Sequence, residues 1–516
     1  MNATISDCGP VDDRVLDTLD AEVLPQVLSE RGLDAATYSG YSYIRPKRVG
    51  IDACRLCAFG TGQEIGFRLI ADNRTDRPAK VSFRVSVKDS AGKSVSEAAR
   101  VEVAAAPRER AARRICFSLA LNGTYTLVYK AQTEQRLFES KVEFAVVPPE
   151  DPQIAAASPF GLHAGHCRLL QAANMRWARN GQIVFAEQLS DQENRDWTTF
   201  DHVLHTAQRH DVSLIPVIQC NPTKQWRARP LADYTRFRSF VRDLVAQFRD
   251  RQTIWEFVNE PNHEQFSPEQ YVEALRAGYE AAKEGDPNCT VVMGGTGCEG
   301  MTPFIERLAE LNVSRFCDVV NMHPYSLAEP PEGEMLAKVR QLQAWRDQHA
   351  PNKPMWSTEF GWMTMHDRGV DQPTLRDYVV RSSILQLAHG QEVVLWCPGA
   401  DRPWEWPWTF SGLYGVDFTP KETYVAFAAL SKLLAGKRCS GSVKRGDGVF
   451  AYAFDGSGER VEALWSPQQT RQIQVKMPKP SVLMDVRANP ITECAAGEVQ
   501  VPVGPTPVFL MEQSSG

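Results

Sequence analysis

The sequence predicts an α/β protein, namely a TIM (β/α)8 barrel flanked by an N-terminal immunoglobulin-like β-sandwich and a small C-terminal β-sandwich. First, short apolar strand patterns alternate with helical patterns between residues 158 and 436. Second, alternating strand patterns separated by turn residues fill the chain on both sides of that part. Third, 516 residues exceed the ~250–300 at which a single core stops growing. We therefore predict a partly helical leader (1–40), a sandwich (41–148), a linker (149–157), the barrel (158–436) and a C-terminal β domain (437–516).

The part before the barrel changes from a helical to a strand pattern. Val15, Leu16, Leu19 and Val23 have helical spacing, and Pro25 should end that helix because proline lacks a backbone N–H. Further on, apolar and polar residues alternate in short runs at 66–71, 81–87, 101–103, 114–117, 123–129 and 141–147. These runs predict the antiparallel sandwich, and the prolines between 148 and 152 predict a stiff linker.

The barrel prediction depends on eight strand-like runs, at 160–163, 175–179, 214–218, 254–258, 291–294, 319–322, 355–358 and 393–396. Helical patterns lie between them. The clearest, at 234–248, places five apolar residues on one side, as a helix outside a barrel requires. A last barrel helix is predicted at 423–434, followed by strands at 448–454, 461–465, 472–475 and 507–511.

Two of these strands end in a glutamate. The apolar run Ile254 to Val258 stops at Asn259, Glu260 and Pro261, and the run after Pro354 reaches Glu359. The C-terminal ends of barrel strands are where catalytic groups lie, because all eight strand ends meet at one face. Two glutamates at two such ends favour chemistry that uses a pair of carboxylates.

The residues around both glutamates resemble a known group of enzymes. Asn259-Glu260-Pro261 and Thr358-Glu359-Phe360-Gly361-Trp362 are similar to the two signature strands of clan A glycoside hydrolases, and within that clan closest to family 39. Glu359 lies 99 residues after Glu260, which fits three βα units of roughly 30 residues. The resemblance implies a retaining glycoside hydrolase that cleaves a β-linked oligo- or polysaccharide without a metal or another cofactor.

In such enzymes one carboxyl group protonates the leaving group and the other attacks the anomeric carbon. The resemblance implies that Glu260 is the acid/base and Glu359 the nucleophile. We expect their carboxyl groups about 5–5.5 Å apart, the retaining distance. We also expect burial and the neighbouring charge to raise the pKa of Glu260, and donors to keep Glu359 ionised.

Four further residues follow from the resemblance. Arg179, at the end of the second strand, is expected beside the nucleophile, and Asn259 is expected to bind the sugar 2-hydroxyl. Tyr325 is expected to donate to the nucleophile, and His323 to line the sugar subsite. Taken alone, the arginine fits a rim salt bridge equally well, and a histidine or tyrosine is usually a hydrogen-bonded core residue.

Aromatic side chains form flat platforms for sugar rings. We expect Trp396, which ends the eighth strand before the aromatic run 404–408, to contact sugar. Trp362, three residues after Glu359, and Trp226, in the third loop, are weaker candidates. His163, His166 and Asn221 follow the first and third strands at the same face, and we include His163 among the binding residues without a defined role.

Three alternatives stay open. The run from Gly295 to Gly300 matches the G-x-G-x-x-G of dinucleotide-binding enzymes, but it lies amid the barrel units, so we interpret it as the fifth βα loop. A catalytically silent, carbohydrate-binding barrel is the non-enzyme alternative, although both glutamates are present. Another clan A family, such as 5, 30 or 51, would act on a different sugar.

Composition and charge give no indication of a nucleic-acid partner or a membrane span. The formal net charge of −6, from 57 basic and 63 acidic residues, gives no reason to expect nucleic acid. No apolar run approaches the ~18 residues of a membrane span, and the start lacks a signal-peptide layout. We expect a cytoplasmic protein as written, or a secreted one if the start is a processed terminus; the sequence carries no signal for an oligomeric state.

The 12 cysteines are scattered, and Cys54 and Cys57 lack the partners of a zinc site.

Overall fold

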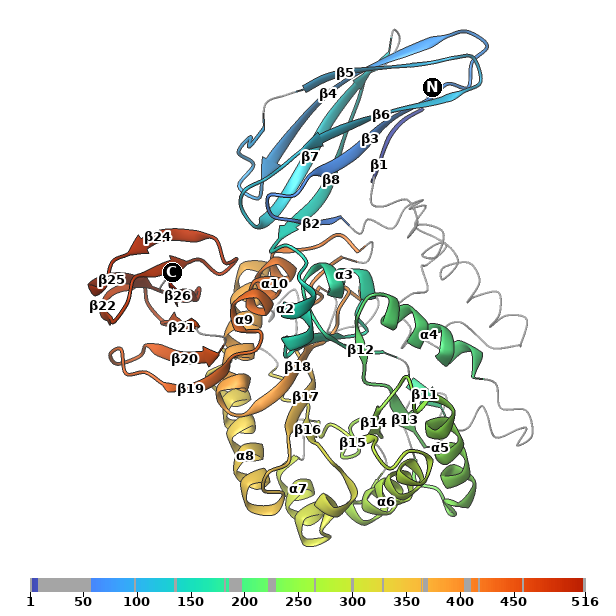
Figure 1. Ribbon diagram of the computed structural model, residues 1–516, viewed down its shortest axis with the longest axis vertical. Coiled ribbons are helices and arrows are strands. Elements are labelled where there is room, and N and C mark those ends of the chain that lie inside the picture. The colour runs from blue at the N-terminus through green and yellow to red at the C-terminus, as the bar shows by residue number, and fades with distance from the viewer. Residues whose placement is uncertain are drawn as a thin grey trace.

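The computed structural model describes residues 2–7 and 57–513, apart from positions 97–98, 134–136, 181, 185–196, 221–228, 264–265, 298–300, 327–328, 363, 365–369, 403–409, 416–417 and 457–458. The predicted leader helix and Cys54 lie outside the described residues. The described elements form three regions along the chain (Figure 1), which we call the N-terminal β region (57–147), the α/β region (152–434) and the C-terminal β region (438–512).

The N-terminal β region consists of two sheets around one apolar core. Its strands are β2 (Ala58–Gly60), β3 (Ile65–Asp72), β4 (Ala79–Asp89), β5 (Ala99–Ala105), β6 (Arg110–Phe117), β7 (Gly123–Gln132) and β8 (Leu137–Val147). The sheet orders are β1-β3-β6 and β2-β8-β7-β4-β5. Each predicted strand is present. At the start of the predicted leader, β1 (Asn2–Asp7) pairs antiparallel with β3.

The α/β region has a strand at each of the eight predicted positions. These are β9 (Phe160–His163), β10 (Trp177–Arg179), β12 (Ser213–Leu214) with β13 (Val217–Gln219), β14 (Ile254–Phe257), β15 (Thr290–Met293), β16 (Val320–Met322), β17 (Met355–Phe360) and β18 (Gln391–Trp396). The third position is divided around Pro216, which cannot donate a ladder hydrogen bond. An additional short strand, β11 (Gln182–Val184), pairs with β13.

The strands of this region pair in parallel. One run has the order β12-β10-β9-β18-β17-β16, so the last strand, β18, pairs with the first, β9. The other run has the order β11-β13-β14-β15. Parallel bridges from Val292 to Val319 and from Thr296 to Met322 connect the β15 and β16 segments.

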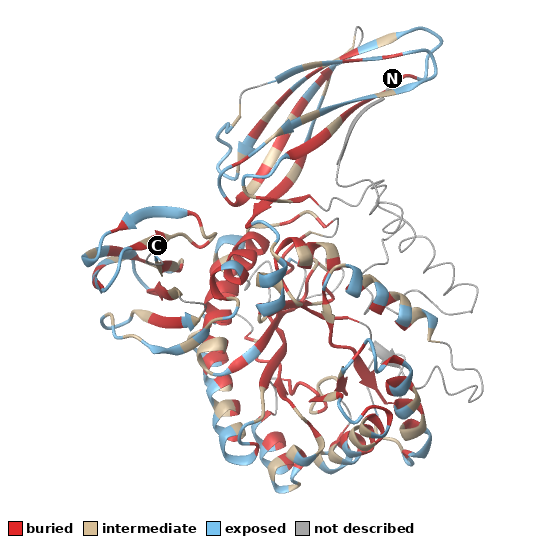
Figure 2. Cartoon of the chain, in the orientation of Figure 1, coloured by how far each residue is buried: buried red, intermediate tan, exposed pale blue. Residues whose placement is uncertain are grey.

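Helices surround these strands (Figure 1). They are α3 (Cys167–Ala172), α4 (Thr198–Arg209), α5 (Thr235–Phe248), α6 (Pro268–Gly285), α7 (Met301–Glu310), α8 (Glu334–His349), α9 (Gln372–Ala388) and α10 (Glu422–Leu434). The predicted stripe of α5 is buried, and Figure 2 shows buried residues concentrated on the central strands and on the helix faces beside them. The predicted linker contains a short helix, α2 (Pro152–Ala157), because the Asp151 side chain caps its first N–H groups.

Side chains alternate between two apolar clusters. One small cluster joins Trp177, Ile215, Val292, Val319, Trp356, Val393 and Leu395, with Ile254 packed against it. The intervening residues Trp255, Phe257, Val394 and Trp396 belong to the large cluster that includes the helices. Because strand residues two apart share a face, Glu256 lies on the same side as Ile254, on the side of the small cluster.

The C-terminal β region consists of β19 (Arg438–Ser442), β20 (Phe450–Gly456), β21 (Glu459–Trp465), β22 (Arg471–Met477), β23 (Ser481–Met484), β24 (Pro490–Cys494), β25 (Gly497–Val503) and β26 (Val508–Glu512). Its sheets, β19-β20-β21-β26-β23-β24 and β22-β25, are antiparallel and share an apolar core. The predicted strands of this part are confirmed. Among the described residues no helix is long and apolar enough to cross a membrane, and the described cysteines do not form disulfides with one another.

Candidate active site

The two glutamates reach the same place from different local structures. Glu359 lies within β17, not after it, and the pairing of β17 with β18 is irregular between Ser357 and Phe360. Glu260 lies beyond the end of β14, where the backbone turns sharply: Val258 has φ 65° and Glu260 has φ 40°. A left-handed backbone is rare for a β-branched residue such as valine, so this turn is strained.

The Glu359 carboxylate is held by three side chains. The Tyr325 hydroxyl donates to Oε2 at 2.7 Å, and Arg179 Nη1 donates to Oε1. His163 Nδ1 lies 3.4 Å from Oε1. Only 9% of Glu359 is exposed, so these contacts replace water around the carboxylate. Arg179 and Tyr325 lie beside Glu359 as predicted, and the structure adds His163, for which the sequence indicated no defined role.

Arg179 is itself fixed by a residue that sequence reasoning missed. The fully buried Glu256 accepts from Arg179 Nε and Nη2, each at 2.8 Å, in a two-point ion pair. Arg179 Nη2 also donates to Asn259 Oδ1 at 2.8 Å, and Nη1 lies 3.1 Å from His163 Nδ1. A charged residue two positions after Ile254, inside an otherwise apolar strand, was the available signal for Glu256.

The Glu260 carboxylate contacts two histidines. His323 Nδ1 lies 3.0 Å from Oε1, and His263 Nδ1 lies 3.4 Å from Oε2. His323 is fully buried, and its Nε2 lies 3.0 Å from Thr358 Oγ1, which in turn accepts from Asn321 Nδ2 at 2.8 Å. His323 was predicted to line the subsite, whereas its contact with Glu260 and the role of His263 were not foreseen.

The carboxyl groups of the two glutamates converge. A carboxylate oxygen of Glu260, a ring nitrogen of His323 and a carboxylate oxygen of Glu359 all lie within 4.8 Å of one another. Donor atoms of His163, Glu359 and Cys397 form a second such group. Both groups have the residue types that hold divalent metal ions. However, the permanent charge of Arg179, bonded to Glu359 and beside His163, opposes a cation in the second group.

The electrostatic environment keeps Glu359 ionised. Burial raises the pKa of Glu359, but the interactions with His163, His323 and Arg179 and the hydrogen bond from Tyr325 outweigh burial and lower that pKa well below the ordinary value. Burial lowers the pKa of His163 to about 3, so His163 is neutral at pH 7 and Arg179 supplies the standing positive charge. Burial also raises the pKa of Tyr325, which therefore stays protonated and donates. This agrees with the expectation for a nucleophile.

Glu260 differs from the expectation for an acid. Burial and the charge of Glu359 raise its pKa, but the hydrogen bonds from His263 and His323 outweigh them and lower the pKa of Glu260 to about 2. From the sequence we predicted a raised pKa for Glu260, because the sequence did not reveal that two histidines contact its carboxylate. With Glu260 ionised, the proton needed for acid catalysis belongs to the Glu260–histidine group as a whole.

Two predicted sugar platforms are corrected by the structure. Trp396 and Trp362 have no exposed surface. Their rings stack on each other at 6.1 Å, and their Nε1–H groups donate to the carbonyls of Ser411 and Glu329. Because alternation along β18 puts Leu395 in the small cluster, Trp396 faces the surrounding helices. Both tryptophans are core residues, and neither can contact a sugar here.

The remaining predicted residues have mixed outcomes. Asn259 is partly exposed beside Arg179, and its backbone N–H donates to Gln219 Oε1 at 3.2 Å. His166 is buried, and its ring contacts Phe418 edge-on at 5.1 Å. Trp226, Asn221 and the aromatic run 404–408 lie outside the described residues.

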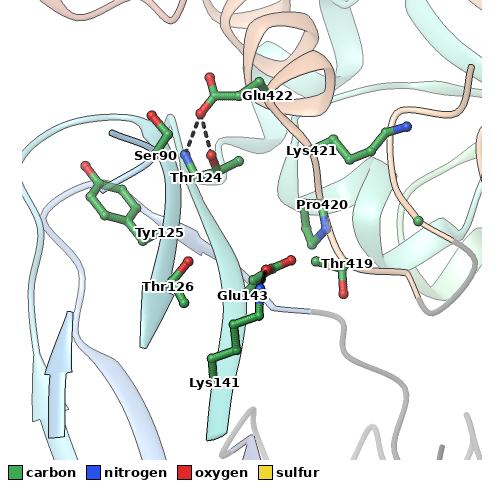
Figure 3. Close-up of a pocket in the computed structure, with 11 residues that line it drawn as sticks. Ser90, Thr124, Tyr125, Thr126, Lys141, Glu143, Thr419, Pro420, Lys421 and Glu422 are labelled. Atoms are coloured by element: carbon green, nitrogen blue, oxygen red, sulfur yellow. Dashed lines mark hydrogen bonds and ion pairs between the residues drawn. The ribbon is translucent and has the colours of Figure 1, made fainter. Parts of the chain in front are cut away.

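A separate cavity of about 570 Å³ lies between the N-terminal β region and the start of α10 (Figure 3). Its walls include Thr124, Tyr125 and Lys141 on one side and Pro420 and Lys421 on the other. The Thr124 side chain and backbone N–H donate to Glu422 across the boundary. None of the residues around Glu260 and Glu359 lines this cavity, so it is not the site of the paired carboxylates.

Comparison with solved structures places the whole arrangement among known folds. A family 39 glycoside hydrolase from Bacteroides cellulosilyticus superposes with a TM-score of 0.69 at 17% identity, covering 89% of this chain and 99% of that chain. The chain shares the fold of that enzyme. A glucosidase from Croceicoccus marinus superposes with a TM-score of 0.51 at 14% identity, covering 68% of this chain and 92% of that chain. No model of a protein family and no curated protein sequence matches this chain. The predicted resemblance to family 39 is therefore confirmed at the level of the fold.

Proposed function

We propose that this protein is a retaining glycoside hydrolase that cleaves a β-linked oligo- or polysaccharide, with Glu260 as acid/base and Glu359 as nucleophile. The observation that carries the proposal is that an oxygen of the Glu260 carboxylate lies within 4.8 Å of an oxygen of the Glu359 carboxylate, while Glu359 is bonded to a permanent cation and Glu260 contacts two histidines. This spacing fits the retaining class, since inverting enzymes keep their carboxyl groups about 6.5–9.5 Å apart to admit a water. The shared fold with a family 39 enzyme supports the same conclusion.

The proposal includes the architecture. We infer that the parallel strands from β9 to β18 close into a (β/α)8 barrel, since β18 pairs with β9 and bridges connect β15 to β16. We also infer that the two antiparallel regions are independent sandwiches, the first immunoglobulin-like, with boundaries near residues 148, 158 and 436. Their separate apolar cores support this division.

In the first chemical step, a Glu359 carboxylate oxygen attacks the anomeric carbon, and the bond from that carbon to the leaving-group oxygen breaks. A proton from the Glu260–histidine group passes through the Glu260 carboxyl group to the departing oxygen, and Glu260 is left as a carboxylate. Arg179 and Tyr325 keep Glu359 ionised and oriented until the bond forms, and the covalent glycosyl-enzyme then has no charge on Glu359. The negative charge of Glu359 raises the pKa of Glu260, so loss of that charge in the glycosyl-enzyme lowers the pKa of Glu260.

In the second step, Glu260 accepts a proton from water, and the water oxygen attacks the anomeric carbon. The bond to Glu359 breaks, the carboxylate reforms beside Arg179, and the product retains the anomeric configuration. Asn259 directly precedes Glu260 in the sequence and accepts a hydrogen bond from Arg179, which supports contact with the sugar 2-hydroxyl. His163 and His323 would border the sugar from the β9 and β16 sides.

Hydrolysis of a broad panel of aryl glycosides and polysaccharides by wild type and by Glu359→Gln tests the proposal. Glu392→Gln, a change at an exposed residue of β18, is the matched control. We expect one class of substrate to be cleaved by wild type and by the control, and the rate to fall by about 10⁴-fold or more in Glu359→Gln. Equal activity in Glu359→Gln would refute the nucleophile. Binding of a glycan without hydrolysis by wild type would favour the carbohydrate-binding alternative.

A further inference from the structure

His263 contacts the carboxyl group of Glu260 from the loop that follows β14. Its Nδ1 lies 3.4 Å from Glu260 Oε2, and its backbone N–H donates to the Glu260 carbonyl at 2.8 Å. His263 keeps 34% of its side chain exposed, whereas His323, at the other carboxyl oxygen, is fully buried. We propose that His263 is a positioning residue that aims the Glu260 carboxyl at the departing oxygen; this inference rests on the proposed function.

The backbone explains why Glu260 needs such a residue. Glu260 lies beyond the regular part of β14, in a turn where Val258 and Glu260 have positive φ. Glu260 belongs to no strand, whereas Glu359 lies within β17, so regular strand backbone does not set the direction of the Glu260 side chain. Contacts at the carboxyl group itself must therefore set its direction. His323 holds Oε1 from the buried side and His263 holds Oε2 from the open side, where a leaving group would depart.

The glycine-rich loop after β15 is shaped around these two histidines. A Cβ atom on Gly295 would lie less than 3.0 Å from the ring of His323, and a Cβ atom on Gly297 would lie less than 3.0 Å from the ring of His263. Both spacings are shorter than real Cβ contacts, so each ring rests directly on a glycine. This gives the G-x-G part of the sequence motif a physical reason that has nothing to do with a dinucleotide.

A second contact locks the two loops together. Asn262 Nδ2 donates to the Gly297 carbonyl at 3.0 Å, and the Gly297 N–H donates to Asn262 Oδ1 at 2.8 Å. The residue before His263 is thus paired with the glycine beneath its ring. The geometry fixes the imidazole from its backbone and from one face, which is what a positioning residue requires.

The first experiment compares His263→Ala with His263→Asn on two substrates of the same sugar. One substrate has a poor leaving group, such as an alkyl or sugar hydroxyl, and the other a dinitrophenolate that leaves without protonation. Protonation of the leaving group contributes about 10²–10⁴-fold where it is needed. We expect His263→Ala to lower kcat/KM at least about tenfold on the poor leaving group and less than about twofold on dinitrophenolate. Asparagine places a donor where Nδ1 lies, so it should recover most of the loss.

The second experiment moves His263 without replacing it. In Gly297→Ala the new methyl must displace the partly exposed His263 ring, so the same loss on the poor leaving group is expected. In the His263→Ala background the clash is gone, so Gly297→Ala should add little. His205→Ala, at an exposed position of α4, and Gly123→Ala, whose methyl would lie 3.6 Å from the Tyr125 ring, are the controls.

The outcomes separate this inference from the proposed function. Equal losses on both leaving groups, or additive losses in the double variant, would overturn the positioning role while wild-type hydrolysis upheld the enzyme. A folded wild type that is inert on every substrate would overturn both. A loss of kcat/KM that depends on the leaving group, occurs in both His263→Ala and Gly297→Ala, and is absent from both controls would establish the positioning role of His263.

Discussion

The two halves of the site are built in opposite ways. Glu359 lies within a strand, is almost fully buried, and is bonded to Arg179, whose charge does not titrate, and to a tyrosine that stays protonated. Glu260 lies in a strained turn beyond a strand, is partly exposed, and contacts two histidines. The first carboxylate is bonded to a permanent cation and a hydroxyl group, whereas the second lies against two imidazole rings.

This difference corresponds to the two proposed roles. A nucleophile must stay ionised and still, so a rigid strand and a permanent cation serve it well. An acid/base must give up a proton and recover it within each turnover, so titratable neighbours serve it better. The structure thus suggests that the environment, more than the identity of the side chain, separates the roles of two chemically identical residues.

Removing Glu260 should produce the largest change on the acid/base side. We expect Glu260→Ala to lower kcat/KM on poor leaving groups by about 10²–10⁴-fold, because departure then lacks a proton. Added azide should restore turnover with a dinitrophenyl substrate, since azide needs no base to attack the glycosyl-enzyme. Glycosyl azide of retained configuration, detected by NMR, is the readout. Glu306→Ala, at an exposed position of α7, is the control, and failure of azide to act would contradict the role of Glu260.

Weakening the buried ion pair between Glu256 and Arg179 should affect both the stability of the fold and catalysis. Glu256→Gln removes the charge that binds Arg179 at two points, and breaking a buried pair on one side costs about 3 kcal/mol of unfolding free energy. Urea denaturation would measure the loss, and kcat should fall because Arg179 is no longer fixed beside Glu359.

The control for this change is Glu462→Gln, which removes one partner of a similar two-point pair with Arg445 in the C-terminal β region. It should destabilise the protein without changing kcat of the folded enzyme. If Glu256→Gln behaved in the same way, the pair with Arg179 would be structural only.

Replacing Trp396, on the strand that pairs with β17, tests whether its ring packs in the protein core or forms a platform for a sugar ring. Trp396→Phe removes the Nε1–H that donates to the Ser411 carbonyl at 2.9 Å, and an unsatisfied buried carbonyl costs about 1–3 kcal/mol. The midpoint of thermal unfolding should fall, while KM changes less than about twofold since the ring is buried. A large rise in KM with unchanged stability would restore the sugar-binding interpretation.

Acid should reveal the neutral state of His163 through the stability of the fold. The pKa of His163 is lowered to about 3, so between the ordinary value of 6.5 and about 3 the unfolded chain binds a proton that the folded chain does not. Stability therefore falls as pH falls through that window, by about 1.4 kcal/mol for each pH unit. His163→Asn should flatten this slope in unfolding measured from pH 7 to 4. An unchanged slope, equal to that of His205→Asn, would contradict the neutral state of His163.

Sequence patterns revealed much of the fold because its strands and helices have regular periods. All eight strand positions of the α/β region were predicted, and the apolar stripe of α5 was predicted residue by residue. Glu260, Glu359, Arg179 and Tyr325 followed from motif and position, and the structure brings them together.

What the sequence did not reveal depends on local irregularities. Motif position alone could not show which side of β18 faces the helices, so Trp396 was placed wrongly. The strained turn at Val258, the irregular pairing of β17 and the packing of His263 on Gly297 depend on contacts between distant segments. For the same reason, the pKa of Glu260 was predicted in the wrong direction, since its two histidines come from different loops.

The central claim is that Glu359 forms a covalent bond to the sugar. The most direct measurement treats the wild type with a 2-deoxy-2-fluoro glycoside of the sugar that the panel identifies, followed by intact mass and peptide mapping. The account predicts one added glycosyl group, on the peptide that contains Glu359, and a product of retained configuration from the ordinary substrate. An adduct on another residue, or a product of inverted configuration, would contradict it.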